Sequence, residues 1–165
     1  MFLLIEDFLR SFAGASWFKA FNFFMQDAYF LPLVAVLAVA VLVLIPRKAT
    51  RVSLLVSLFV AAVLVYFLKV FYADPRPCAG LDWCESGYGF PSGHATLAFT
   101  LATHTFGTKY FYAFLLLATL VALSRVAAGV HSFEQVVAGA ILGFVVSTSV
   151  NILLDKVVQL RRLVK

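Results

Sequence analysis

Five apolar runs take up most of this chain and limit what it can fold into more than any other feature. They cover residues 29–45, 52–72, 92–107, 110–123 and 133–154. A membrane-spanning helix needs about 20 mostly apolar residues, so runs of this kind are typical of spans. The composition agrees, because 63% of the 165 residues are hydrophobic, whereas soluble domains are only about 45–50% apolar. The sequence predicts an all-α, polytopic membrane helical bundle that uses residues 1–165 as a single domain.

Residues 1–24 differ from the five runs, because they carry four charged side chains that would make a membrane crossing costly. Helical spacing places the charges of the first turns opposite an apolar face made of Phe2, Ile5, Phe8, Leu9, Phe12 and Ala13. This pattern predicts an amphipathic helix in the membrane interface, followed by the transmembrane bundle over residues 25–165. A tilted sixth span is the alternative. A cleaved signal peptide is not expected, because the start of the chain is acidic rather than basic.

Basic residues between the runs predict which side of the membrane each loop occupies. Residues 46–51 contain three, Lys109 adds one, and the tail after residue 154 contains four. Alternation of the five spans places all of these on one side, which the positive-inside rule identifies as cytoplasmic. The loop 73–90 therefore faces the exterior. It contains Cys78 and Cys84, for which a disulfide and two free thiols both remain open.

Three groups of polar residues fall at the outer ends of these runs, where ionisable side chains are costly and tend to be functional. They are Lys69 with Arg76-Pro77, then Pro91-Ser92-Gly93-His94, then Ser124-Arg125 with His131. Each residue alone has a structural explanation, such as a helix cap for Ser92 or an interfacial anchor for Arg76. Together they provide three cations, two imidazoles and a helix N-terminus without a cluster of acidic metal ligands. This combination suits a phosphoryl group.

Other polar and small residues are expected to serve the structure. His104 lies in the middle of a run and is interpreted as a packing residue. The acidic residues of the loop are interpreted as solvated charges; they are Asp74, Asp82 and Glu85. Gly139 and Gly143 have the small-xxx-small spacing that lets two membrane helices pack closely.

The order and spacing of the three polar groups resemble the type-2 phosphatidic acid phosphatase superfamily, membrane lipid phosphatases related to vanadium-dependent haloperoxidases. That family has Lys, six residues, Arg-Pro; then Pro-Ser-Gly-His; then Ser-Arg, five residues, His, three residues, Asp. The first two motifs are complete here, at residues 69–77 and 91–94. The third is matched from Ser124 to His131, but Gln135 stands where the family has Asp.

The resemblance implies a role for each matched residue. His131 would attack phosphorus to give a phosphohistidine, and His94 would protonate the leaving oxygen and then activate water. The remaining matched residues would hold the phosphoryl oxygens; they are Lys69, Arg76, Ser92, Gly93 and Arg125. Neither a metal ion nor another cofactor is expected.

Gln135 lies one helical turn after His131, so the two side chains share a face. Its carbonyl can accept a hydrogen bond from Nδ1–H of the imidazole and orient the ring. It cannot stabilise an imidazolium as a carboxylate would. From the sequence alone we expect retained but slower chemistry, and a higher turnover in Gln135→Asp.

The function implied by the resemblance is hydrolysis of a membrane lipid phosphate or pyrophosphate. Candidate substrates are undecaprenyl pyrophosphate, phosphatidylglycerophosphate, phosphatidic acid and lipid A 1-phosphate, with a prenyl pyrophosphate or lipid A-type substrate favoured. The short loops are similar to those of prokaryotic members, which implies a cytoplasmic (inner) membrane with the site facing the periplasm or exterior. Two alternatives remain: a lipid phosphotransferase with the same site, and a lipid-phosphate binding or transport protein whose catalysis Gln135 impairs. The expected partners are the lipid substrate and the bilayer, not nucleic acid, and the oligomeric state is open.

Overall fold

The computed structural model describes residues 2–24, 27–45, 48–82 and 84–163, and every regular element among them is helical. The α-helices are α1 (Phe2–Arg10), α2 (Ser16–Phe24), α3 (Asp27–Leu44), α4 (Lys48–Tyr72), α5 (Gly93–His104), α6 (Phe111–Ala127) and α7 (Phe133–Leu163). A short 3-10 turn, Ser11–Gly14, separates the first two. The predicted all-α fold is confirmed for the described residues.

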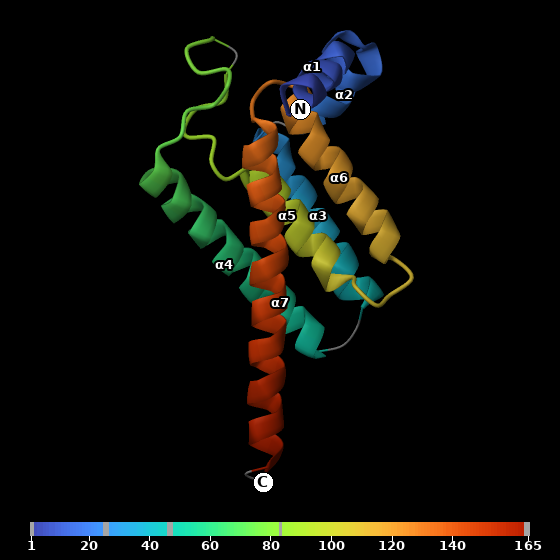
Figure 1. Ribbon diagram of the computed structural model, residues 1–165. Helices are drawn as coiled ribbons and strands as arrows, with labels where there is room; N and C mark the ends of the chain where they lie inside the picture. Colours follow the sequence, from blue (N-terminus) through green and yellow to red (C-terminus); the bar gives the residue numbers. More distant parts are fainter. Residues whose placement is uncertain (1, 25–26, 46–47, 83, 164–165) are drawn as a thin grey trace.

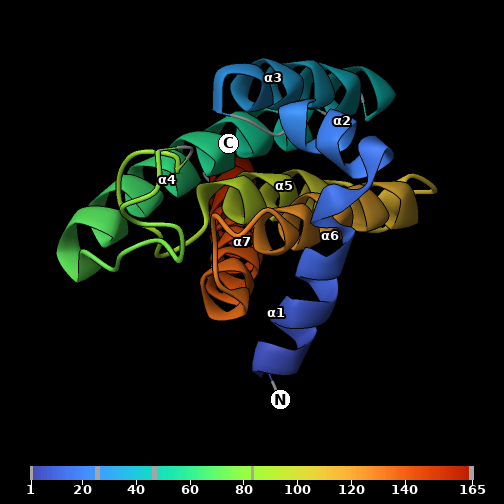
Figure 2. The same cartoon turned by 90° about the horizontal axis from the view of Figure 1, so that it is seen from above.

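Helix α5 lies at the centre of the bundle, with α3 and α4 on one side and α6 and α7 on the other (Figure 2). Ser92 caps its start, because the Ser92 hydroxyl accepts a bond from the Ala95 N–H. The hydroxyls of Thr96 and Thr100 each donate to the carbonyl four residues earlier, at 2.8 Å. Polar side chains satisfied within their own helix can be buried, so α5 can be surrounded by other helices.

Glycines let α7 approach α5 closely. A Cβ added at Gly139 would lie 2.5 Å from the Ser92 carbonyl oxygen, and one added at Gly143 would collide with the Thr96 carbonyl oxygen. The close packing expected from the spacing of these two glycines is confirmed. It fixes the start of α5 beside the start of α7.

The helix bounds differ from the apolar runs at several ends. Helix α5 ends at His104 rather than near residue 107, α6 continues to Ala127 rather than 123, and α7 continues to Leu163 rather than 154. In α6 the helix continues through Ser124, whose hydroxyl donates to the Val121 carbonyl at 2.6 Å. A polar residue ends an apolar run in the sequence, but it does not end a ladder of backbone hydrogen bonds.

Among the described residues, two stretches are long and apolar enough to cross a membrane by themselves, Arg51–Tyr72 and Phe133–Leu160. Tyr29–Leu44 and Phe111–Ala127 are shorter apolar helices. Large apolar side chains on the outward faces of α4 and α7 are well exposed, for example Phe59 (71%) and Val145 (50%). Such faces suit contact with lipid tails rather than water.

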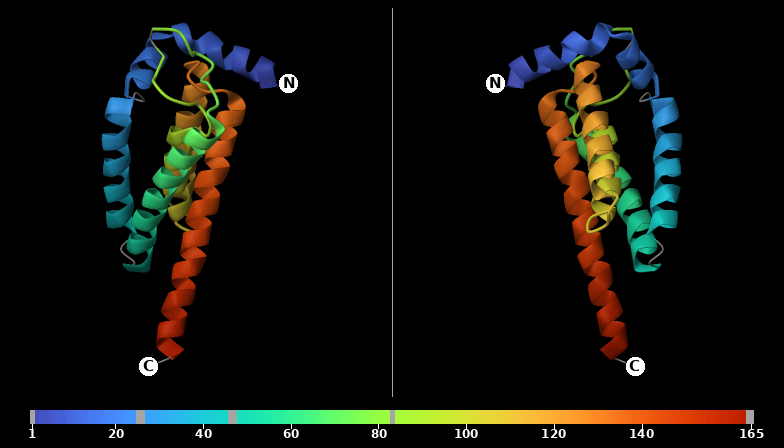
Figure 3. Two further views of the ribbon diagram at one scale, coloured as in Figure 1. Left: turned by 90° about the vertical axis from the view of Figure 1, so that its left-hand side faces the viewer. Right: turned by 90° about the vertical axis from the view of Figure 1, so that its right-hand side faces the viewer.

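Residues 2–24 form two short helices rather than the single helix expected. The chain turns at Ala15, which is extended, with φ −68° and ψ 136°. Helix α1 lies across one end of the bundle (Figure 3). Glu6 points inward rather than outward, because its carboxylate accepts a bond from the Phe133 N–H at 2.8 Å. An acidic group at the start of α7 is favourable, since the first N–H groups of a helix lack partners.

One end of the bundle gathers helices α1 and α2, the loop after α4 and the junction between α6 and α7 (Figure 1). The C-terminal part of α7 projects beyond the other helices at the opposite end. Within the loop, Cys78 and Cys84 form a disulfide with an S–S distance of 2.05 Å. Of the two states that the sequence left open, the structure contains the bridge.

Candidate active site

The three polar groups of the sequence meet at the loop end of the bundle. Their residues come from five places: the last turn of α4 (Lys69), the loop (Arg76), the start of α5 (Ser92, Gly93 and His94), the last turn of α6 (Arg125), and the junction of α6 with α7 (His131 before α7, Gln135 in its first turn). One ring nitrogen of His94, one of His131 and a carboxylate oxygen of Glu85 lie within 4.8 Å of one another. Side chains from the loop, from the start of α5 and from the segment before α7 therefore surround one small volume.

His131 is buried, with 1% of its surface exposed. Burial, followed by the charge of the neighbouring Arg76, lowers the pKa of His131 to about 3. The ring is therefore neutral at physiological pH, with one protonated nitrogen and one lone pair. Arg76 Nη1 lies 3.2 Å from His131 Nε2. Because a guanidinium only donates, Nε2 carries the lone pair and can act as a nucleophile.

Gln135 lies behind the other nitrogen of this ring, as expected from the spacing. Its Oε1 is 3.0 Å from His131 Nδ1. Its Nε2 donates to Asp74 Oδ2 at 2.8 Å. The interpretation of Asp74 as a solvated loop charge is therefore wrong, since the carboxylate is bound to a residue of the candidate site.

His94 lies in the first turn of α5 and is 4% exposed. Its ring stacks on Phe30 of α3, with the centroids 4.0 Å apart and the planes at 35°. The sequence analysis did not identify Phe30, because an aromatic residue at the start of an apolar run has no local feature that sets it apart.

Two buried arginines face one carboxylate. Arg76 and Arg125 are 6% and 1% exposed. Arg76 Nη1 donates to Glu85 Oε2 at 2.9 Å, and Arg125 Nη1 donates to Glu85 Oε1 at 3.1 Å. The interpretation of Glu85 as a solvated charge is also wrong, because these ion pairs hold it inside the site. In the sequence, the one sign that Glu85 is held in place was its position directly after Cys84, because the Cys78–Cys84 bridge ties this part of the loop.

The remaining predicted residues lie at the edge of this cluster. Lys69 Nζ donates to the Tyr88 carbonyl oxygen. Ser92 is fully buried and caps α5. A Cβ added at Gly93 would touch only Val65, at 3.5 Å, so packing does not require glycine at this position. Asp82 is exposed, as expected.

The charges around the cluster favour an anion over a metal ion. Glu85, His94 and His131 are close enough to bind a cation together. However, Glu85 already forms two ion pairs with guanidinium groups, and those groups would repel a metal ion. Arg76 Nε is also buried without a hydrogen-bond partner among the described residues, which leaves one donor for a further acceptor.

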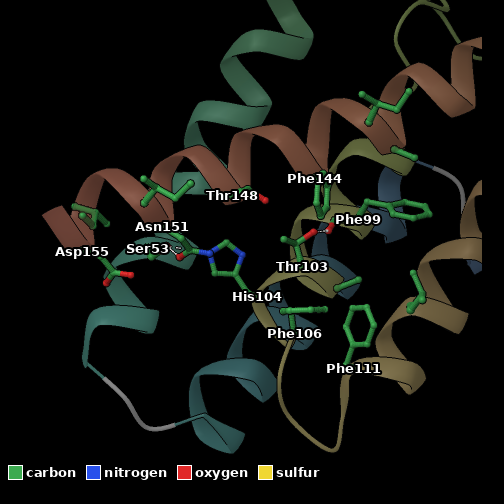
Figure 4. Close-up of a pocket in the computed structure, with 16 residues that line it drawn as sticks. Ser53, Phe99, Thr103, His104, Phe106, Phe111, Phe144, Thr148, Asn151 and Asp155 are labelled. Atoms are coloured by element: carbon green, nitrogen blue, oxygen red, sulfur yellow. Dashed lines mark hydrogen bonds between the residues drawn. The ribbon is translucent and has the colours of Figure 1, made fainter.

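A separate cavity of about 920 Å³ lies between α4, α5, α6 and α7, far along α5 from His94 (Figure 4). None of the predicted site residues lines it. His104 lies in its wall, with Nε2 3.1 Å from Ser53 Oγ and Nδ1 3.0 Å from the Thr100 carbonyl. These bonds agree with the interpretation of His104 as a packing residue.

Comparison with known proteins agrees with this arrangement. The family model of the PAP2 superfamily matches residues 50–158. The crystal structure of Aquifex aeolicus LpxE has 28% sequence identity and a TM-score of 0.67, over 90% of this chain and 91% of that one. The crystal structure of the first transmembrane PAP2-type phosphatidylglycerolphosphate phosphatase from Bacillus subtilis has a TM-score of 0.70, over 93% of this chain and 84% of that one. At its 20% identity the likeness is one of fold.

A search among curated proteins finds no match. The family model nevertheless covers well over half of the chain, and it includes every predicted site residue. The chain belongs to the PAP2 superfamily, whose members include membrane lipid phosphatases.

Proposed function

We propose that this protein is a phosphatase that removes phosphate from a membrane lipid phosphate or pyrophosphate through a phosphohistidine, without a metal ion. The observation that carries the proposal is the position of the neutral Nε2 of His131. It lies 3.2 Å from an Arg76 guanidinium nitrogen, in a cluster that also holds His94.

The two arginines provide the binding step. Arg76 and Arg125 already hold the carboxylate of Glu85, which is an anion with oxygen acceptors like those of a phosphoryl group. A phosphoryl group offers three such oxygens and more charge, so it can replace the carboxylate and also use the unpaired Nε of Arg76. The N-terminus of α5 and Lys69 add positive potential at the same end of the bundle.

The chemistry follows in two displacements. His131 Nε2 forms a bond to phosphorus while the bond from phosphorus to the lipid oxygen breaks, and His94 donates a proton to that oxygen. Water then attacks the phosphorus, His94 takes one of its protons, and the N–P bond breaks. Inorganic phosphate leaves, and both histidines return to their starting states. The arginines stabilise the charge on the phosphoryl oxygens in both steps.

The position of the site supports a lipid substrate. It lies at the end of helices whose outward faces carry exposed apolar side chains, so a lipid tail can stay in the bilayer while its phosphate reaches His131. The basic residues at the opposite end of the bundle support an orientation with the site outside the cytoplasmic membrane. The candidate lipids are those named from the sequence, which include the substrate class in the name of the Bacillus relative.

The test is phosphate release by the purified protein in detergent, with excess chelator and no added acceptor alcohol. The panel contains lipid A 1-phosphate, phosphatidylglycerophosphate, phosphatidic acid and undecaprenyl pyrophosphate. We expect release from at least one lipid, equal with and without chelator, and inhibition by vanadate. Absence of release from all of them would overturn the proposal, and so would a loss of activity in chelator that added metal restores. Release that requires an acceptor alcohol would indicate the phosphotransferase instead.

Glu85→Gln is expected to bind vanadate and inorganic phosphate several-fold more tightly than the unsubstituted protein. The carboxylate competes with these anions for the same guanidinium groups, and an amide competes less well. The measurements are the inhibition constants and the rise in melting temperature caused by phosphate. Asp82→Asn, which removes an exposed carboxylate from the same loop, is the matched control. Unchanged anion affinity in Glu85→Gln would contradict the expected competition.

A further inference from the structure

The side-chain amide of Gln135 has four hydrogen-bond partners. Its Oε1 lies 3.0 Å from His131 Nδ1 and accepts from the Ser132 N–H at 3.2 Å. Its Nε2 donates to Asp74 Oδ2 at 2.8 Å and to the Pro75 carbonyl oxygen at 3.2 Å. The amide therefore connects the nucleophilic histidine with a carboxylate from the loop after α4.

The chemistry of these partners allows only one orientation of the amide. An ionised carboxylate and a carbonyl oxygen can only accept, so Nε2 of Gln135 has to face Asp74 and Pro75. A backbone N–H can only donate, so Oε1 has to face Ser132 and, with it, His131. The proton of the neutral imidazole must then be on Nδ1, which leaves the lone pair of Nε2 directed at Arg76.

We propose that Asp74 is a positioning residue that acts on His131 through Gln135. Asp74 fixes the amide, the amide fixes the tautomer of His131, and the tautomer presents the nucleophilic nitrogen to the phosphoryl group. The carboxylate also supplies negative charge when attack on phosphorus makes the imidazole cationic, because an intervening amide transmits polarisation along the hydrogen-bond chain. Position 74 thus provides the carboxylate that the family has at the position of Gln135. Its effect on rate rests on the proposed phosphatase function.

The surroundings cover the amide at the centre of this chain of hydrogen bonds, while Asp74 is half-buried. Gln135 is 3% exposed. Gly89 packs directly on its amide, since an added Cβ would lie 2.5 Å from Nε2 and 2.6 Å from Oε1. The Gly89 N–H donates to the Asp74 carbonyl at 2.8 Å, and the Ser92 N–H donates to the Gln135 carbonyl at 2.9 Å. These two backbone hydrogen bonds tie the end of the loop before α5 to Asp74 and Gln135.

This arrangement reverses the expectation that Gln135→Asp raises turnover. A carboxylate at position 135 would face the carboxylate of Asp74, and like charges at hydrogen-bond distance repel. The shorter side chain would also reach less far toward His131. We now expect Gln135→Asp to lower kcat.

The decisive experiment exchanges the carboxylate and the amide without changing their shapes. In Asp74→Asn the charge is lost, and the new amide can present either its carbonyl or its NH₂. The orientation of Gln135 is then held only by its two longer bonds, to Pro75 and Ser132, both at 3.2 Å. In Gln135→Glu two carboxylates face each other. In the double variant the NH₂ at position 74 can donate to a carboxylate at position 135, which can accept the Nδ1–H of His131.

We expect each single exchange to lower kcat by at least about tenfold with little change in KM, because a carboxylate behind a catalytic histidine fixes its tautomer and stabilises its cationic form. The double variant is expected to exceed both single variants. Asp82→Asn, the exposed carboxylate of the same loop, is expected to match the unsubstituted protein. A kcat of Asp74→Asn equal to that of the unsubstituted protein, or a double variant no faster than the slower single one, would overturn the inference.

The pH profile gives a readout that a packing role would not change. In Gln135→Glu, repulsion raises the pKa of the facing carboxyl pair, and the protonated pair regains an O–H that can bridge the two side chains. The activity of Gln135→Glu relative to the unsubstituted protein is therefore expected to rise as the pH falls. A ratio that does not depend on pH would contradict the proposed repulsion.

A measurement without substrate separates this inference from the proposed function. The chain contains three histidines, so ¹⁵N-labelled imidazoles give few signals, and His131→Ala assigns the one of interest. We expect the Nδ1–H tautomer in the unsubstituted protein and a mixture of tautomers in Asp74→Asn. An unchanged tautomer in Asp74→Asn would overturn the inference even if the protein is an active phosphatase. If no lipid phosphate is hydrolysed, the proposed function fails and the tautomer result still stands.

Discussion

Asparagine in place of His94 is expected to stop turnover with the phosphoryl group still on His131, whereas alanine in place of His131 should prevent that transfer altogether. The two rings share one small volume, and Nε2 of His131 faces the guanidinium group of Arg76, which is expected to hold the phosphoryl group. His94 acts in both steps, first as acid and then as base. A substrate with a good leaving group needs little help from the acid, so the first step can continue without His94 while water activation fails.

The expected loss of steady-state phosphate release in His94→Asn is about 10²–10⁴-fold, the usual contribution of general acid–base catalysis. The direct measurement is covalent labelling by a radioactive aryl phosphate, with the label lost in acid and kept in base. His104→Asn removes the third histidine, which lies in the separate cavity, and serves as the control for removing a buried ring. Label on His131→Ala, or none on His94→Asn, would contradict the assigned roles.

Leucine in place of Gly143 is expected to destabilise the protein and to abolish activity at the same time. A Cβ at this position already collides with the Thr96 carbonyl oxygen and would lie 3.0 Å from the Thr100 backbone nitrogen. Backbone atoms of α5 cannot rotate away as a side chain can, so the two helices must separate. Their separation would move His94 and Ser92 away from His131.

The expected loss of stability exceeds the typical cost of overpacking, about 1–3 kcal/mol. The measurement is the apparent melting temperature in detergent, together with phosphate release. Val145→Leu adds a methylene group on the same helix at a residue that is 50% exposed, and it serves as the matched control. Equal melting temperatures for the two variants would contradict the importance of the close α5–α7 contact.

The sequence predicted the helices better than their ends, and the reason lies in what each signal records. Hydropathy records where a chain can contact lipid, so the runs that became α3 and α4 were placed within a few residues. It gives no information about Arg125, which continues α6 and is buried because Glu85, 40 residues earlier, neutralises it. Only the folded chain brings that partner into place.

The same limit applies to the candidate site. The motif spacing identified the two histidines and the residues around them, because that information is local. Asp74, Glu85 and Phe30 were missed or misinterpreted, because each contacts the site through a residue distant in sequence. An acidic residue in a polar loop reads as solvated until its partner is known.

The family match begins at residue 50, yet two contacts reach the site from earlier in the chain. Phe30 covers one face of the His94 ring, and Glu6 holds the first N–H of α7 just after His131. A shortened version that starts at residue 50 would retain all the residues expected to face the phosphate. It would lose Phe30, which packs on His94, and Glu6, which binds the start of α7 beside His131. A chimera between relatives should therefore take α1 to α3 from the same protein that supplies the site residues.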